Sequence, residues 1–232
     1  MAKLCAEKLV PSVLELGGKN PCLIDDLSCQ EITVNDIARR ILWSKVANSG
    51  QICLAVDYCI FKSISDRDTI LNEMKSIIKK EWYPNGVDSK EPDYCHLVSK
   101  QHFQHVERFL SRLNEGESCV KIIDAEPDID SLFYPVSAIL MEDPDRVGEV
   151  EVFGSNFGCV VIEDFEQAIK FIAKRESALS AYIFTKDSRK VDRFLDGTKS
   201  GGVTVNDCMK HALNDTLQRV QCEKFRKRCF FK

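Results

Sequence analysis

Short apolar runs alternate with amphipathic stretches along the chain. Short runs rich in β-branched and aromatic residues predict buried strands, whereas apolar residues that recur every three or four positions predict helices. The expected strands are 12–16, 21–25, 57–62, 118–123, 134–141, 159–164, 180–187 and 201–207. The expected helices are 33–50, 66–82, 100–113, 164–175 and 188–197, and a turn-rich loop is expected at 143–158. This alternation predicts an α/β fold whose mainly parallel sheet carries helices on both faces.

The helix expected at 33–50 places one cysteine in a prominent position. Apolar residues repeat every four positions along this stretch, and its basic residues, Lys45 among them, are expected to face water. Gly50 is a typical helix terminator, because glycine tolerates the left-handed conformation that often ends a helix. Cys53 is therefore expected just past a helix end.

Composition and charge narrow the classes of partner. The 232 residues suffice for one large domain or two small ones, and 32 basic and 36 acidic residues give a net charge of -4. This balance gives no electrostatic reason to expect nucleic acid or an anionic membrane, so a small molecule or a protein is the expected partner. The odd count of 11 cysteines, with no secretory signal, indicates free thiols and a cytoplasmic protein. No apolar run approaches the roughly 20 residues of a transmembrane helix.

Four motifs occur together in a fixed order, and they carry the candidate chemistry. They are LELGGKNP at 14–21, NSGQIC at 48–53, EVFG at 151–154 and SGGVTVND at 200–207. In this combination the chain resembles the aldehyde dehydrogenase superfamily, and its phrasing is similar to the class 3 branch that includes the fatty aldehyde dehydrogenases. The resemblance covers about residues 1–213.

The resemblance implies that Cys53 is the nucleophile. Its thiolate would attack an aldehyde carbonyl, hydride would pass to NAD or NADP, and water would cleave the resulting thioester. A free thiol is largely protonated at neutral pH, so the site has to favour the anion. The family also uses the backbone N–H of the nucleophile as an oxyanion donor. The alternative is a small buried core residue, which is the usual role of cysteine.

Glu15 is implied as the general base of thioester hydrolysis. It lies inside the apolar run 12–16, where burial would raise its pKa. Leu16 and Gly17 are implied to contact the cofactor, since the glycine pair allows a close backbone approach. Glu15 and Cys53 are 38 positions apart, more than the class 3 pattern has, and the excess is assigned to 25–36. A surface insertion costs only a few tenths of a kcal/mol in loop entropy, so the site geometry is expected to survive it.

The cofactor clamp of the family corresponds to Glu151 and Phe153, with the carboxylate on the nicotinamide-side ribose and the ring beside the nicotinamide. Ser155 replaces the proline of the family pattern, which predicts a less rigid loop. Asn206 and His211 are weaker candidates for the substrate pocket, with a satisfied polar turn as the alternative.

No metal site is expected, although cysteine and histidine gather at 95–105. Their spacing matches no standard zinc ligand set.

Three segments are expected from the comparison with the family: the end of the cofactor-binding domain at 1–20, the catalytic thiol domain at 21–213, and a divergent basic tail at 214–232. The phosphate-binding turn and the asparagine that completes the oxyanion hole have no counterpart here. We therefore expect an aldehyde dehydrogenase that turns over poorly as this chain alone. Two alternatives stay open: a non-catalytic interaction module and a thiol esterase. The expected assembly is a homodimer or a pairing with a full-length subunit.

Overall fold

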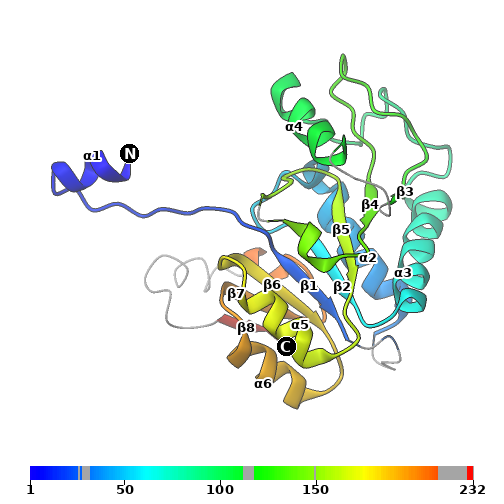
Figure 1. Cartoon of the computed structure of the whole chain (residues 1–232). Helices are drawn as coiled ribbons and strands as arrows, with labels where there is room; N and C mark the ends of the chain where they lie inside the picture. Colours follow the sequence, from blue (N-terminus) through cyan, green and yellow to red (C-terminus); the bar gives the residue numbers. More distant parts are fainter. Residues whose placement is uncertain (26, 28–31, 112–117, 149, 214–228, 232) are drawn as a thin grey trace.

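A computed structural model describes residues 1–25, 27, 32–111, 118–148, 150–213 and 229–231. The described residues form one sheet of eight strands in the order β3-β4-β5-β2-β1-β6-β7-β8 (Figure 1). The strands are β1 (Pro21–Ile24), β2 (Tyr58–Phe61), β3 (Ser118–Lys121), β4 (Ser137–Leu140), β5 (Phe157–Val161), β6 (Ala178–Phe184), β7 (Ser200–Val205) and β8 (Cys229–Phe231). β3 and β4 are antiparallel, whereas the other paired strands run parallel.

Helices cover both faces of the sheet, as the sequence predicts. The α-helices are α1 (Ala2–Glu7), α2 (Val34–Val46), α3 (Ile64–Ile77), α4 (Lys100–Ser111), α5 (Phe165–Ala173) and α6 (Ser188–Gly197). Shorter turns of helix are η1 (Ala47–Gly50), η2 (Ile78–Trp82), η3 (Pro144–Val147) and η4 (Lys210–Leu213). Cys22 and Ile24 pack with α2 and α3, whereas Leu23 between them packs with α5 and α6. This alternation follows from the two-residue period of a strand and produces two cores, one on each face.

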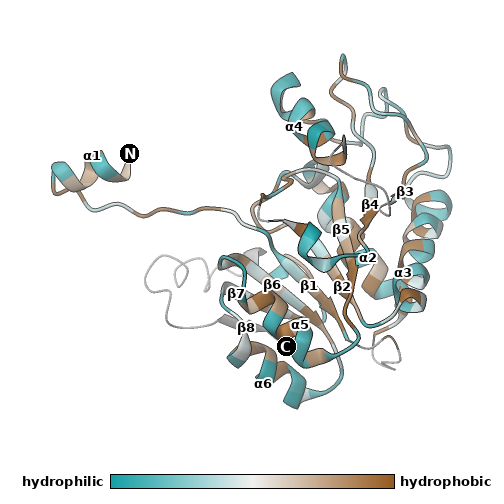
Figure 2. Ribbon diagram, viewed as in Figure 1, coloured by the Kyte–Doolittle hydropathy of each residue, from teal (hydrophilic) through white to brown (hydrophobic). Residues whose placement is uncertain are grey.

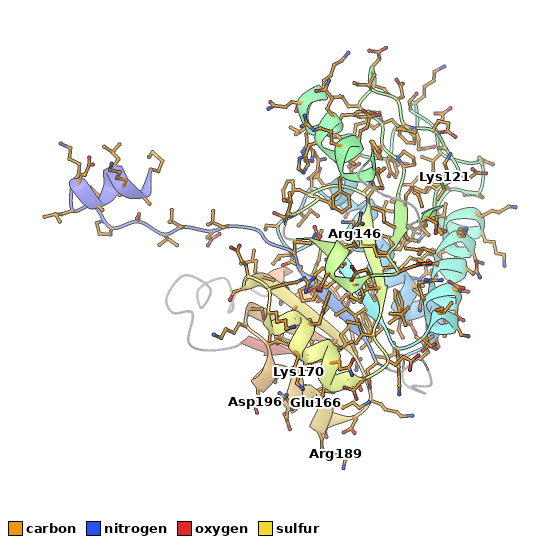
Figure 3. All side chains as sticks on the ribbon, viewed as in Figure 1. Lys121, Arg146, Glu166, Lys170, Arg189 and Asp196 are labelled. Atoms are coloured by element: carbon orange, nitrogen blue, oxygen red, sulfur yellow. The ribbon has the colours of Figure 1, made fainter. Side chains whose placement is uncertain are left out.

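The amphipathic helices turn their polar sides to the solvent (Figure 2). On the outer side of α5 and α6, Figure 3 shows the charged side chains of Glu166, Lys170, Arg189 and Asp196. Arg193 Nε donates to Glu166 Oε1 at 2.9 Å and links the two helices. An exposed pair of this kind adds little stability, so burial of the apolar faces holds this layer together.

The strand expected at 12–16 is wrong. Residues 10–18 form an extended arm that leads from the turn after α1 to the sheet (Figure 1), and Val13, Leu14 and Leu16 are 64%, 53% and 72% exposed. An apolar run becomes a strand only where neighbouring strands and a covering layer meet it, and the arm lies away from the sheet. The other expected strands and helices are confirmed to within a few residues. β8 was missed, because it lies in the basic segment 214–232 that the sequence analysis set apart as a divergent tail.

No helix within the described ranges is both long and apolar enough to cross a membrane.

Candidate active site

Three of the predicted site segments meet at one edge of the sheet. Glu15 to Asn20 lead into β1, Cys53 precedes β2, and Glu151 to Phe153 precede β5. β5, β2 and β1 are neighbours and run parallel, so their amino ends lie side by side. Segments about 100 residues apart in the sequence therefore converge at the amino ends of three central strands.

Cys53 lies on a tightly turned loop after α2 and η1. Asn48, Ser49 and Gly50 adopt left-handed conformations, with φ of 50°, 52° and 69°. Ser49 Oγ donates to the Cys95 carbonyl and fixes this turn from outside. A side chain at Gly50 would collide with the carbonyl oxygen of Gly154, so glycine is required here by both its conformation and its packing.

Two buried side chains hold the peptide groups around Cys53. Asn20 Nδ2 donates to the carbonyls of Cys53 and Ala55 at 2.8 and 2.9 Å, and the Tyr182 hydroxyl donates to the Leu54 carbonyl at 2.6 Å. Asn20 also accepts the Ser180 N–H at 2.9 Å, which links this loop to β6. The sequence analysis missed Asn20 and Tyr182, because their role depends on contacts between segments far apart in the chain.

The thiol of Cys53 is exposed, unlike those of Cys22, Cys59, Cys159 and Cys208. Partial burial is the largest cause that raises its pKa, and the carboxylates of Glu151 and Glu15 raise it further. The backbone N–H groups of Cys53 and Leu54 act in the opposite direction, because they hydrogen-bond to the sulfur. The thiol is thus accessible and flanked by two carboxylates, and its neighbours favour the protonated form.

Glu15 is exposed, so the expectation that its apolar neighbours bury it is wrong. Those neighbours lie on the extended arm, where no layer covers them. Its negative charge nevertheless helps to raise the pKa of the Cys53 thiol.

Glu151 is half-buried against the glycine pair of the first motif. A Cβ atom added to Gly17 would lie 2.8 Å from Glu151 Oε2, so a side chain here would displace the carboxylate from its present position. Burial raises the pKa of Glu151, the Gly18 N–H lowers it by donating a hydrogen bond, and the Asp57 carboxylate raises it again. Two lysines nearby lower it. Glu151, Gly17 and Gly18 therefore lie together, a contact that the motifs alone did not predict.

A buried charge network that the sequence analysis missed supports this unit. Lys19 forms an ion pair with Asp57, and the two side chains are 7% and 4% exposed. Lys45, expected to face water, is 1% exposed, and its Nζ donates to the Val56 carbonyl at 2.8 Å. Burial lowers the pKa of Lys45 to about 8, against the opposing effect of Asp57. The burial of Lys45 could have been predicted, because Lys45 lies four residues after the buried Ile41 and therefore on the same side of α2.

Phe153 presents its ring at the same edge, with 36% of its surface exposed and a left-handed φ of 49°. Ser155, which stands where the family pattern has proline, anchors the loop through its own side chain. Ser155 is fully buried, and its hydroxyl donates to the Tyr134 carbonyl at 3.1 Å.

Asn206 and His211 both have hydrogen-bond partners within the protein. Asn206 follows β7 at the carboxyl edge and exchanges hydrogen bonds with Thr185, at 2.9 and 3.1 Å. His211 is buried between Thr204 Oγ1 at 2.8 Å and Ser180 Oγ at 3.4 Å, and burial lowers its pKa. These contacts match the satisfied polar turn that was the alternative, and substrate contact by either residue stays a prediction.

The described residues hold no group of three histidine, cysteine or acidic side chains that could bind a metal ion.

The residues at the amino edge fit the nicotinamide half of a dinucleotide. Glu151 offers an acceptor for ribose hydroxyls, Phe153 offers a partly exposed ring, and Gly17 and Gly18 leave the backbone open to close approach. A carboxylate whose pKa is raised by burial gains from hydrogen-bond donors such as hydroxyl groups. Leu16 is exposed beside them.

Known proteins share this sequence and fold. The aldehyde dehydrogenase family model matches residues 1–217. Aldehyde dehydrogenase family 3 member A2 of Rattus norvegicus is 34% identical over 213 residues, which is 91% of this chain and 41% of the relative. The dimeric NADP-preferring aldehyde dehydrogenase of Canis lupus familiaris is 35% identical over 207 residues, 89% of this chain and 43% of the relative. The chain thus spans about two fifths of these relatives.

Solved structures agree in fold. The substrate-bound state of Staphylococcus aureus AldH superposes with a TM-score of 0.81 at 24% identity, covering 93% of this chain and 45% of that one. Betaine aldehyde dehydrogenase of Staphylococcus aureus in complex with NAD+ gives a TM-score of 0.71 at 25% identity, covering 89% and 41%. With three of the four motifs gathered at one edge of this sheet and a family match over residues 1–217, the chain belongs to the aldehyde dehydrogenase family.

Proposed function

We propose that this chain oxidises an aldehyde to a carboxylic acid through a covalent adduct on Cys53. The observation that carries the proposal is the accessible thiol of Cys53 with the carboxylates of Glu15 and Glu151 acting on it. An exposed nucleophile with acid–base groups in reach is the arrangement that acyl chemistry requires.

In the proposed reaction, the deprotonated sulfur of Cys53 attacks the carbonyl carbon, and the C–S bond converts the aldehyde into a thiohemiacetal. The N–H of Cys53, which hydrogen-bonds to its own sulfur, becomes available to the oxygen that gains negative charge. NAD(P)+ supplies the hydride acceptor when it is bound. The thioester that remains is cleaved by water, whose proton passes to Glu15, and the acid leaves as the thiol is restored.

The assignment of roles follows from burial. Glu151 is half-buried against Gly17 and bonded by Gly18, which suits a fixed ribose acceptor. Glu15 is exposed on the arm, which suits exchange of protons with water. Loss of the thiol proton opposes the field of both carboxylates, so the first step is expected to speed up with rising pH.

The cofactor is NAD or NADP, and the canine relative is named as NADP-preferring. We expect weak cofactor affinity from this chain on its own, because the contacts we assign among the described residues reach only the nicotinamide-side ribose and ring. A homodimer is the proposed assembly, since the same relative is named as dimeric. A cytoplasmic location is proposed from the free thiols among the described residues.

The decisive experiment measures the reactivity of Cys53. The full chain is treated with a limiting dose of iodoacetamide, and labelling of each cysteine is followed by mass spectrometry. Cys95 and Cys119 are exposed as well and serve as internal references. The reaction is run at a pH that ionises all three thiols, so that the raised pKa of Cys53 does not mask its nucleophilicity, and we expect Cys53 to label faster than either. Equal labelling of the three cysteines would overturn the nucleophile assignment.

Two activity assays separate the remaining alternatives. Reduction of NAD+ or NADP+ with hexanal reports the dehydrogenase, and cleavage of p-nitrophenyl acetate reports the thiol alone. Cleavage of the ester by the wild type but not by Cys53→Ser, with no hexanal oxidation at millimolar cofactor, would identify a thiol esterase. Absence of both reactions would identify a non-catalytic interaction module. Cys95→Ser is the matched control and should keep the wild-type rates.

A further inference from the structure

The backbone of the loop that carries Glu151 and Phe153 is fixed by side chains at almost every residue. Five contacts run along it: Lys19 Nζ to the Val150 carbonyl (3.0 Å), His105 Nε2 to the Glu151 carbonyl (3.3 Å), Asp57 Oδ2 to the Val152 N–H (2.9 Å), His102 Nε2 to the Phe153 carbonyl (2.6 Å) and Ser155 Oγ to the Tyr134 carbonyl (3.1 Å). The two histidine contacts fall on the two residues assigned to the cofactor.

His102 and His105 lie on a helix that is anchored by buried side chains. They lie three residues apart on α4, and their rings stack with centroids 5.7 Å apart and planes 14° apart. The buried Phe103 and Val106 anchor the same helix, and Val106 lies directly against Gly154 of the loop. The His102 ring also meets the Phe153 ring edge-on, with centroids 6.1 Å apart.

Phe153 needs such a restraint. Its φ of 49° lies in the left-handed region, which is unfavourable for a residue with a side chain and persists only where the surroundings impose it. The shorter of the two histidine contacts reaches the carbonyl of this same residue. A released Phe153 would relax toward ordinary backbone angles and turn its ring and the neighbouring Glu151 away from their present positions.

We propose that His102 and His105 are positioning residues, which hold the 150–155 loop so that Glu151 and Phe153 face the cofactor. The role toward the cofactor rests on the proposed function. The hydrogen bonds that hold the loop do not depend on that function. Because a carbonyl oxygen only accepts hydrogen bonds, each Nε2 must carry a hydrogen. Neither histidine touches the reacting atoms.

The test follows amide hydrogen exchange of the peptide that spans 150–155 in the full chain. Loss of the hydrogen bond and release of Phe153 should speed exchange roughly tenfold in His102→Leu. His105→Leu, which loses the longer contact, should show about a threefold increase. Lys100→Ala is the control. Lys100 also lies on α4 and forms an exposed ion pair with Asp130, so this variant should leave hydrogen exchange of the 150–155 peptide unchanged.

A conservative pair of variants distinguishes the hydrogen bond from simple packing. The glutamine amide reaches the position of Nε2, whereas the shorter asparagine amide reaches only that of Nδ1. His102→Gln should therefore restore protection to within about twofold of the wild type, and His102→Asn should not. Unchanged exchange in both leucine variants, or equal rescue by asparagine and glutamine, would overturn the proposal. The glutamine and asparagine variants also test the proposal if His102→Leu fails to fold.

Cofactor binding is measured separately, by saturation-transfer NMR of the nicotinamide protons of NADP+. Weaker transfer in His102→Leu, restored in His102→Gln, would support the positioning role. No transfer in the wild type would count against the proposed cofactor, while hydrogen exchange would still decide whether the histidines hold the loop.

Discussion

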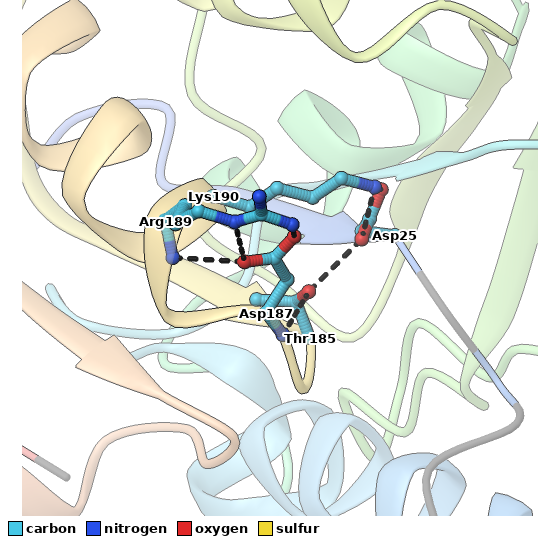
Figure 4. Close-up of polar contacts among 5 residues, drawn as sticks. All are labelled: Asp25, Thr185, Asp187, Arg189 and Lys190. Atoms are coloured by element: carbon cyan, nitrogen blue, oxygen red, sulfur yellow. Dashed lines mark hydrogen bonds and ion pairs between the residues drawn. The ribbon is translucent and has the colours of Figure 1, made fainter.

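An aspartate–lysine pair lies at each of the two edges of the sheet, and the two pairs have different roles. At the carboxyl edge, Asp25 accepts Lys190 Nζ at 2.6 and 2.8 Å and Thr185 Oγ1 at 2.9 Å (Figure 4). In the same view, Arg189 is bound to Asp187 through both carboxylate oxygens. At the amino edge, Asp57 pairs with Lys19 and also accepts the Val152 N–H.

The difference lies in what each aspartate supports. Asp25 joins the end of β1 to Thr185 after β6 and Lys190 on α6, so its hydrogen bonds tie regular elements together. Asp57 holds the loop at Val152, directly after Glu151, whose pKa is raised by burial and whose charge raises the pKa of the Cys53 thiol. A buried aspartate–lysine pair is thus a structural device at both edges, and at the amino edge it supports the loop to which we assign a role in catalysis.

This assignment runs against a general rule. Ligands of open α/β sheets usually bind beyond the carboxyl ends of the strands. Here Cys53, Glu15 and Glu151 all precede their strands, at the opposite edge. Single substitutions at each edge test this difference.

The largest effect is expected from Cys53→Ser. A serine hydroxyl at this position lacks the acidity of a thiol, so ester cleavage and aldehyde oxidation should fall by roughly a thousandfold or more. Rates are measured with p-nitrophenyl acetate and with hexanal plus NADP+. Thr185→Val, a change at the carboxyl edge, should keep both rates, and a residual rate near wild type in Cys53→Ser would refute the assignment.

Next are the two aspartates. Removing one partner of a buried ion pair leaves an unpaired charge, so Asp57→Asn should lower the free energy of unfolding by about 3 kcal/mol. Asp25→Asn should cost somewhat less, since Lys190 is 32% exposed and can be hydrated, whereas Lys19 is 7% exposed. Urea denaturation measures both.

The labelling rate of Cys53 distinguishes the edges in these same variants. Asp57→Asn should raise it, because a loosened loop lets the Glu151 carboxylate move away from the thiol. Asp25→Asn should leave it unchanged. The comparison of the two edges fails if both variants change the rate equally.

A smaller loss is expected from Gly50→Ala. The left-handed backbone and the collision with the Gly154 carbonyl together should lower the free energy of unfolding by about 2 kcal/mol. Gly86→Ala is the matched control: its φ is 87°, and a Cβ atom there would meet nothing within 4 Å. It should cost about 1 kcal/mol, the strain alone. Equal losses in urea denaturation would show that contact between the two loops is unimportant.

The smallest effect is expected from Glu151→Gln. The native state binds the Glu151 proton more tightly than the unfolded state, so its contribution to stability falls as pH rises through its ordinary pKa to the raised value. At pH 7 the carboxylate is therefore destabilising. Because the group is half-exposed, removing its charge should stabilise the fold by only a few tenths of a kcal/mol. The gain should vanish at a pH below the ordinary glutamate range.

The same variant tests the electrostatic link to Cys53. Without the Glu151 charge, the thiol pKa should fall, and alkylation at pH 8 should speed up about twofold. Glu166→Gln, which loses an exposed ion pair with Arg193, is the control: it should not stabilise the fold at pH 7 and should leave the alkylation rate unchanged.

The sequence by itself determined most elements and the motifs of the site. Strand and helix periods are local, so β1, α2, β2 and the later elements could be predicted from spacing alone. The sequence also contained the motif around Cys53 and the turn at Gly50. Glycine is required at that turn, because the backbone is left-handed and a side chain would collide with the Gly154 carbonyl.

Only the tertiary structure decided which of these residues meet and how they are charged. The exposed Glu15 and the anchors Asn20 and Asp57 could not be assigned from spacing, since burial and hydrogen bonding depend on segments up to 160 residues away. The stack of His102 on His105 against the loop of Glu151 and Phe153 is of the same kind. Local periodicity selects the elements, whereas the convergence of strand ends makes the site.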